Sequence, residues 1–142
     1  MDLKHKTLES IDLSYCTILD KDYSGLEFDG ADFSYARFER VNFSGCSFEN
    51  CVMENTRFTD CQMTDMQVES CRMFGAEFVG GELTGTEFRD CGLQGSGFLH
   101  TDMTKVSMAD CERDGMMLYS HGQQEQMLDT VIWVVGFSLS SL

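Results

Sequence analysis

An apolar side chain recurs at every fifth residue over most of this chain, and the register never slips. The series runs from Leu3 to Met108, and all 22 of its positions are apolar or aromatic in a chain that is 42% hydrophobic overall. Neither the 3.6-residue period of a helix nor the two-residue period of a strand produces this pattern. An unbroken short repeat predicts a solenoid, in which each unit buries its apolar residue against neighbouring units.

A second register, two residues before the first, holds mostly small side chains such as Ala31, Cys46 and Ala76. We expect it to point inward as well, while the other three residues of each pentad face water. Like residues also recur 20 apart, as hydroxyls at Ser24, Ser44, Thr64, Thr84 and Thr104 and as thiols at Cys51, Cys71, Cys91 and Cys111. Neighbouring coils of a solenoid stack identical side chains in this way. Twenty residues per coil means four pentads and therefore four faces.

These pentads resemble those of the pentapeptide-repeat family. Examples are Ala31-Asp32-Phe33-Ser34-Tyr35, Val41-Asn42-Phe43-Ser44-Gly45 and Ala76-Glu77-Phe78-Val79-Gly80. The resemblance implies an all-β solenoid, a right-handed quadrilateral β-helix, which we assign to residues 1–120. It does not by itself imply a function, because members of one fold family serve many roles.

The tail, residues 121–142, breaks the five-residue period. Several of its apolar residues fall on one helical face, which predicts a short α-helix from about 123 to 133. An open solenoid end needs a cap, and the tail is either that cap alone or a cap that also joins two copies. We expect a homodimer through Met127, Leu128, Val131, Ile132, Trp133 and Val135.

The segment from Met127 to Gly136 is similar to the apolar C-terminal segment of Qnr-type pentapeptide proteins and their relative MfpA. The resemblance implies a bacterial protein that binds DNA gyrase or topoisomerase IV, dimerises end to end and is connected with quinolone resistance. This chain is shorter than Qnr proteins and lacks the loops that interrupt their coils.

Acidic residues outnumber basic ones, 24 to 10, and give a net charge of −14. A charge of this sign repels nucleic acid and anionic membranes and favours a basic partner, although it also serves solubility. On one predicted face Arg89 is the only basic residue that flanks the central positions, and the acidic outward residues form a partner-binding stripe: Glu9, Glu27, Asp29, Glu49, Glu69 and Glu87. Another face alternates in sign, with Arg37, Glu39, Arg57 and Glu77.

The charge density of the rod approaches that of DNA. Between five and six coils at ~4.8 Å each make a rod of roughly 26 Å. Duplex DNA of this length carries about 15 negative charges, at one per ~1.7 Å. Residues 1–120 hold 22 acidic and 10 basic residues, a net of −12.

Catalytic and metal sites are not expected. The three histidines lie far apart in the repeat, and no nucleophile–base pair or nucleotide-binding glycine pattern is present. All seven cysteines occupy the inward register without a Cys-x-x-Cys pair, so packing explains them without a metal, a cofactor or disulfides. Thiols suit a reducing compartment, and the N-terminus does not resemble a signal peptide, so we expect a cytoplasmic protein.

Two functions remain open. The first is a non-enzymatic, DNA-mimicking rod that binds a type II topoisomerase, gyrase or topoisomerase IV. The alternative is a protein-interaction scaffold or effector module that meets another protein partner through an exposed apolar patch of Phe74, Val79 and Leu99. A catalytic or metal-binding protein is a third class. Tightly bound zinc or iron in a stoichiometric amount would support it.

Overall fold

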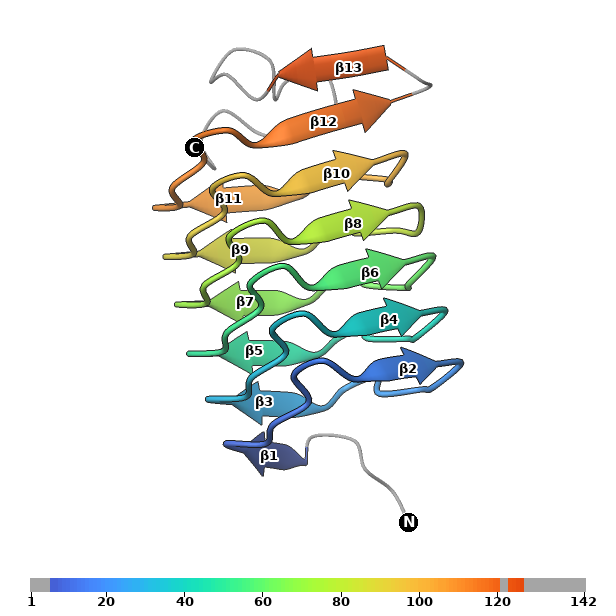
Figure 1. Cartoon of the computed structure of the whole chain (residues 1–142), viewed down its shortest axis with the longest axis vertical. Coiled ribbons are helices and arrows are strands. Elements are labelled where there is room, and N and C mark those ends of the chain that lie inside the picture. The colour runs from blue at the N-terminus through green and yellow to red at the C-terminus, as the bar shows by residue number, and fades with distance from the viewer. Residues whose placement is uncertain (1–5, 121–122, 127–142) are drawn as a thin grey trace.

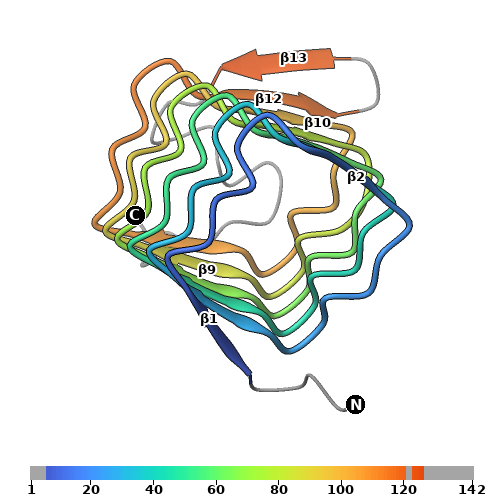
Figure 2. The same cartoon turned by 60° about the horizontal axis from the view of Figure 1, so that its bottom comes forward.

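The computed structural model describes residues 6–120 and 123–126, which form a four-sided tube of stacked coils (Figure 1, Figure 2). One side is a six-stranded parallel sheet in the order β1-β3-β5-β7-β9-β11. Its strands are β1 (Thr7–Glu9), β3 (Glu27–Asp29), β5 (Ser47–Glu49), β7 (Gln67–Glu69), β9 (Glu87–Arg89) and β11 (Ser107–Ala109).

The opposite side is a seven-stranded sheet in the order β13-β12-β10-β8-β6-β4-β2 (Figure 2). Its strands are β2 (Thr17–Leu19), β4 (Arg37–Glu39), β6 (Arg57–Thr59), β8 (Glu77–Val79), β10 (Gly97–Leu99), β12 (Met117–Ser120) and β13 (Gln123–Gln126). All pairs are parallel except β12 with β13, which is antiparallel.

Four faces follow one another along each coil, and we number them in chain order. Face 1 carries β1 to β11 and face 3 carries β2 to β12. Face 2 is joined by single parallel bridges at Asp12, Asp32, Val52, Arg72, Gly92 and Glu112, and face 4 likewise at Asp22, Asn42, Gln62, Glu82 and Asp102. Every parallel pairing joins residues 20 apart, as Leu8 with Phe28. The predicted quadrilateral β-helix with four pentads per coil is confirmed.

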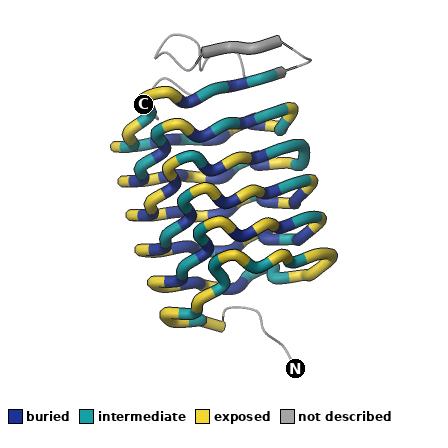
Figure 3. The backbone as a smooth tube through the Cα atoms, in the orientation of Figure 1, coloured by how far each residue is buried: buried dark blue, intermediate teal, exposed yellow. Residues whose placement is uncertain are grey.

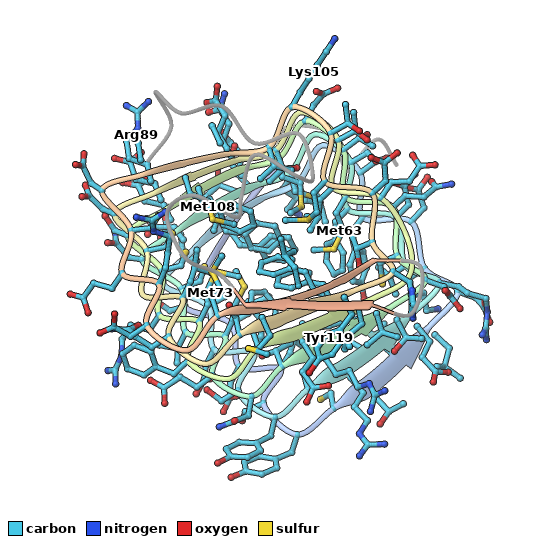
Figure 4. The ribbon with its side chains drawn as sticks, turned by 90° about the horizontal axis from the view of Figure 1, so that it is seen from above. Met63, Met73, Arg89, Lys105, Met108 and Tyr119 are labelled. Atoms are coloured by element: carbon cyan, nitrogen blue, oxygen red, sulfur yellow. The ribbon has the colours of Figure 1, made fainter. Side chains whose placement is uncertain are left out.

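The core is built from the two inward registers, so burial alternates along every coil (Figure 3). Methionines 63, 73 and 108 point into the tube from three different faces, whereas Arg89 and Lys105 point away from it (Figure 4). Phenylalanines of one face stack at the strand spacing, with ring centroids of Phe78 and Phe98 4.8 Å apart and parallel. The polar members of the small register are satisfied by the backbone, as where Thr56 donates to the Phe33 carbonyl at 2.7 Å.

Two kinds of corner alternate along the chain. Every fifth residue from Ser10 to Gly115 has a positive φ. After faces 2 and 4 the corner belongs to a β-turn, closed for example by the Cys16 N–H on the Leu13 carbonyl at 3.2 Å. The positive φ then falls on the third turn residue, as in a type II turn, where glycine is favoured. Glycine accordingly occupies six of these eleven corners but only two of the eleven after faces 1 and 3.

The side chains before the turns explain why Asp or Asn precedes the large apolar residue in many pentads. Asp32 and Asn42 each accept the backbone N–H two residues later, from Ser34 and Ser44, at 2.9 Å. These bonds organise the turn locally. The hydroxyls that follow also meet between coils, since Thr64 Oγ1 donates to Ser44 Oγ at 3.0 Å.

The predicted α-helix from 123 to 133 is wrong at its start. Residues Gln123–Gln126 form strand β13, which pairs with β12 and places Tyr119 opposite Gln124. The last coil presents unpaired backbone groups at its edge, and an added strand satisfies them. Residues 127–133 lie outside the described residues. The part of the chain that is described contains no helix long and apolar enough to cross a membrane.

Candidate partner-binding surface

Four carboxylates stand in line on face 1. Strand pairing places Glu9 beside Asp29, Asp29 beside Glu49, and Glu49 beside Glu69. Successive members are therefore one strand spacing of ~4.8 Å apart along the tube. All four are exposed. We call this set the acidic ladder, and it is a straight row of negative charge on a sheet.

The other two residues of the predicted stripe, Glu27 and Glu87, lie on the same face. They precede the central apolar residue of their strands, whereas the residues of the acidic ladder follow it. Glu27 accepts a hydrogen bond from the Thr7 hydroxyl at 2.9 Å, and Glu87 lies three coils further along the same column, beyond uncharged Ser47 and Gln67. Arg89 follows Glu69 in register and ends the ladder. Gln67, Val68, Glu69, Glu87 and Arg89 line a shallow depression here. The structure thus brings all six acidic residues together on one face.

None of these six carboxylates takes part in an ion pair within the described residues. The close ion pairs are on other faces, where Arg40 reaches Asp20 and Arg72 reaches Glu54, both at 2.7 Å. The bond from Arg40 lowers the pKa of Asp20 below its ordinary value. Like charges in register destabilise a sheet, so the ladder contributes no stability to the fold.

The predicted apolar patch of Phe74, Val79 and Leu99 is divided by the fold. Val79 and Leu99 are neighbours on the outer side of face 3, where β8 pairs with β10, and Tyr119 follows Leu99 in register. Phe74 lies on face 2, before the corner at Gly75, and its ring carries the Arg72 guanidinium at 5.7 Å from the centroid. Face 3 therefore offers a short apolar strip of Val79, Leu99 and Tyr119, each half-buried.

A stacked tyrosine pair was not predicted. Tyr15 and Tyr35 occupy equivalent corners after face 2 in successive coils, with ring centroids 5.1 Å apart and planes 4° from parallel. Tyr15 is 74% exposed and Tyr35 52%. The signal was available in the sequence, because the two tyrosines are 20 residues apart.

The thiols are buried packing groups. All seven cysteines are free, and Cys51, Cys71, Cys91 and Cys111 stack on successive coils. Each of these four donates to backbone carbonyls, as Cys71 to the Glu69 carbonyl at 3.3 Å. Burial raises the pKa of Cys46 and Cys61 to about 11, and neighbouring thiols together with burial raise that of Cys71. The described residues include no cluster of His, Cys, Asp or Glu suited to a metal ion.

The residues expected to form a dimer interface lie outside the described residues. They are Met127, Leu128, Val131, Ile132, Trp133 and Val135. Strand β13, the last described element, ends at Gln126, opposite Met117.

Comparison with known proteins identifies the repeat. The family model described as a pentapeptide repeat region matches residues 21–98 and, in a second overlapping match, residues 41–118. No curated protein matches the chain significantly.

Solved structures share the fold at low sequence identity. Rfr23, a pentapeptide repeat protein from the cyanobacterium Cyanothece 51142, is 12% identical, with a TM-score of 0.61 over 82% of this chain and 88% of its own. A pentapeptide repeat protein of the Arabidopsis thaliana thylakoid lumen is 16% identical, with a TM-score of 0.60 over 72% and 67%. A trypsin-treated form of QnrB1, a plasmid-mediated fluoroquinolone resistance protein, is 15% identical, with a TM-score of 0.58 over 82% and 73%.

Proposed function

This chain belongs to the pentapeptide repeat family, and we propose that it is a non-enzymatic rod that binds a type II topoisomerase in place of DNA. The observation that carries the proposal is the acidic ladder of Glu9, Asp29, Glu49 and Glu69, which lines one face in register and takes no counter-ion from the described part of the chain. A basic protein surface is the partner that this face fits.

Charge density supports DNA as the molecule that is imitated. Face 1 has six strands from β1 to β11, so its length is five spacings of ~4.8 Å, or about 24 Å. Duplex DNA of about 24 Å carries roughly 14 charges. Residues 1–120 have 22 acidic and 10 basic residues, a net of −12. The rod therefore carries nearly as much negative charge per unit length as duplex DNA does. A basic surface that binds duplex DNA would experience a similar electrostatic field from the rod.

Preorganisation supports the same proposal. The ladder stands on a regular sheet whose backbone is fixed by pairing on both sides of each inner strand, so little conformational freedom is lost on binding. Repulsion between neighbouring carboxylates is present in the free protein and is relieved when cations of a partner approach. Both effects make binding of a basic partner more favourable.

The choice of a topoisomerase rests on likeness. QnrB1, which shares the fold, is named for fluoroquinolone resistance, and fluoroquinolones act on type II topoisomerases. The apolar segment from Met127 to Gly136 is similar to the closing segment of Qnr-type proteins. The proposal includes a bacterial cytoplasm, which agrees with seven unpaired thiols.

The test is gyrase-catalysed supercoiling, and topoisomerase IV decatenation, with titrated protein in the presence and absence of a fluoroquinolone. We expect inhibition or drug protection at micromolar protein, weakening steeply with salt. The variant Glu49→Lys/Glu69→Lys should abolish the effect. Its matched control, Glu77→Lys/Glu82→Lys, makes the same change in net charge on faces 3 and 4, where both glutamates are exposed, and should retain it. Equal loss in both variants, or no response to the wild-type protein, would refute the assignment.

A second candidate is an interaction scaffold for another protein partner. The apolar strip of Val79, Leu99 and Tyr119 on face 3 favours it, because contiguous outward apolar side chains mark interaction sites. Capture of a partner that is insensitive to Glu49→Lys/Glu69→Lys but lost in Val79→Ser/Leu99→Ser would select this function over the first.

A further inference from the structure

The stacked tyrosines have no structural role that burial explains. Tyr15 and Tyr35 are the two most exposed large hydrophobic side chains of the described residues, at 74% and 52%. Their rings are parallel, so each ring turns one face toward the other ring and one face away from it. Solvent-exposed aromatic side chains that are held in a fixed orientation are common in binding sites.

Their backbone conformation also works against the fold. Tyr15 and Tyr35 have φ of 63° and 61°, in the left-handed region that bulky residues avoid. The same corner column continues with Asn55, Gly75, Gly95 and Gly115, residue types that adopt this conformation readily. A positive φ is general at the corners of this repeat, so what distinguishes Tyr15 and Tyr35 is that a large aromatic side chain occupies the strained position.

Negative charge surrounds the pair. Asp12 and Asp32 are bridged neighbours on face 2 that each bind a following backbone N–H through Oδ1, and neither is in an ion pair. Around the preceding corner lie Glu9 and Asp29 of the acidic ladder. The first two coils thus present carboxylates on faces 1 and 2. The tyrosines lie at the corner where face 2 ends.

We propose that the Tyr15–Tyr35 pair is a docking site for arginine side chains of the basic partner. A guanidinium is planar and stacks on the open face of a tyrosine ring, while Asp12 and Asp32 offset its charge. This inference rests on the proposed function only because it requires a basic partner. It adds that the partner contacts this site through arginine side chains. Within the described residues, Arg37, two residues after Tyr35, makes no cation–π contact with either ring; that contact is made by Arg72 with Phe74.

The experiment compares fluorescein-labelled nona-arginine and nona-lysine peptides by anisotropy at low salt. The two peptides carry the same charge, but arginine also makes bidentate bonds to carboxylates and stacks on rings. The contribution of the rings is therefore the part of the arginine preference that the tyrosine variants remove. We expect each ring to contribute a preference for the arginine peptide of at most roughly two- to five-fold, since this range is the whole cation–π energy and lysine also makes that contact. Tyr15→Asn/Tyr35→Asn should lose that preference, and Tyr15→Phe/Tyr35→Phe should retain it, because the ring and not the hydroxyl makes the contact.

Folding and electrostatics are controlled separately. Asparagine tolerates positive φ, so Tyr15→Asn/Tyr35→Asn should melt at or above the wild-type temperature. Glu49→Gln/Glu69→Gln should weaken both peptides and leave their ratio unchanged. An unchanged ratio in the folded asparagine variant would overturn the inference, and so would a wild-type ratio of one. The gyrase assay is independent, so a topoisomerase assignment that fails leaves the peptide ratio standing.

Discussion

Gly81 is the position where a single methyl group should damage the tube most. It lies in the small inward register and has a φ of +79°, in addition to the positive φ of the corner at Gly80. A Cβ at Gly81 would overlap the backbone carbonyl oxygen of Cys61 in the coil below and approach the Cys61 nitrogen to 2.9 Å. The Cys61 carbonyl accepts the Glu82 N–H at 3.2 Å, so it cannot withdraw without loss of pairing.

The expected magnitude has two parts. An L-residue in the left-handed region costs about 1–2 kcal/mol. Overlap with backbone atoms that cannot move freely adds about 1–3 kcal/mol. Gly81→Ala should therefore lower the free energy of unfolding by about 2–5 kcal/mol.

The matched control is Gly45→Ala. Gly45 has a φ of +73°, but the nearest atom to its added Cβ, the Gly25 nitrogen, lies 4.0 Å away. This variant carries the backbone strain without the overlap and should lose only about 1–2 kcal/mol. Guanidinium unfolding followed by circular dichroism gives both values, provided that the m-value is unchanged. Equal destabilisation of the two variants, to within about 0.5 kcal/mol, would refute the steric argument.

Three further predictions concern the thiols, acid stability and assembly. At pH 8 iodoacetamide should label native protein fastest at half-buried Cys16. The neighbouring Cys91 thiol and burial raise the pKa of half-buried Cys111, and the other five thiols are buried, with the pKa of Cys46 and Cys61 raised to about 11. All seven should react in guanidinium, as counted by mass spectrometry, and native labelling of Cys46 or Cys61 contradicts this. Hydrogen bonds from the Thr104 hydroxyl and N–H lower the pKa of Asp102, so its stabilisation is present above the ordinary pKa of 3.8 and is lost as pH falls through the lower folded-state pKa. Asp102→Asn should keep the turn and make the loss of stability below pH 3.8 less steep, and an unchanged slope in acid melts would count against it. Trp133→Asp should convert a dimer to a monomer in light scattering, and an unchanged mass would remove the tail as the interface.

The five-residue register was sufficient to predict the core, because a solenoid buries each residue only against its equivalents in adjacent coils. Phe33 and Phe78 are buried as their register requires, and the acidic side chains of face 1 point outward for the same reason. The two kinds of corner were not predicted. They alternate with a period of ten, and the apolar pattern repeats every five residues and does not distinguish them.

Two errors have physical causes outside the repeat. Helical periodicity takes no account of the unpaired edge of β12, which Gln123–Gln126 satisfies as a strand. Grouping Phe74 with Val79 and Leu99 ignored the corner at Gly75, which turns the chain from face 2 to face 3. Both errors concern where one element meets another, information that a local pattern does not contain.

Two departures from local rules begin in the first coils of this rod and adjoin one another. Single departures occur elsewhere, where Arg37 lies beside Arg57 and where Lys105 occupies a turn corner. Carboxylates stand in register from Glu9 to Glu69 where alternating charge would stabilise the sheet, as Arg57 beside Glu77 does on face 3. Tyrosines stand at corners where glycine or asparagine would relieve strain. A repeat this regular could satisfy both rules by exchange of single outward residues, without any change to the core. The acidic ladder and the tyrosine pair both keep the less stable residues, and the two surfaces adjoin one another. This supports the proposal that they act together on one basic partner that presents arginine side chains.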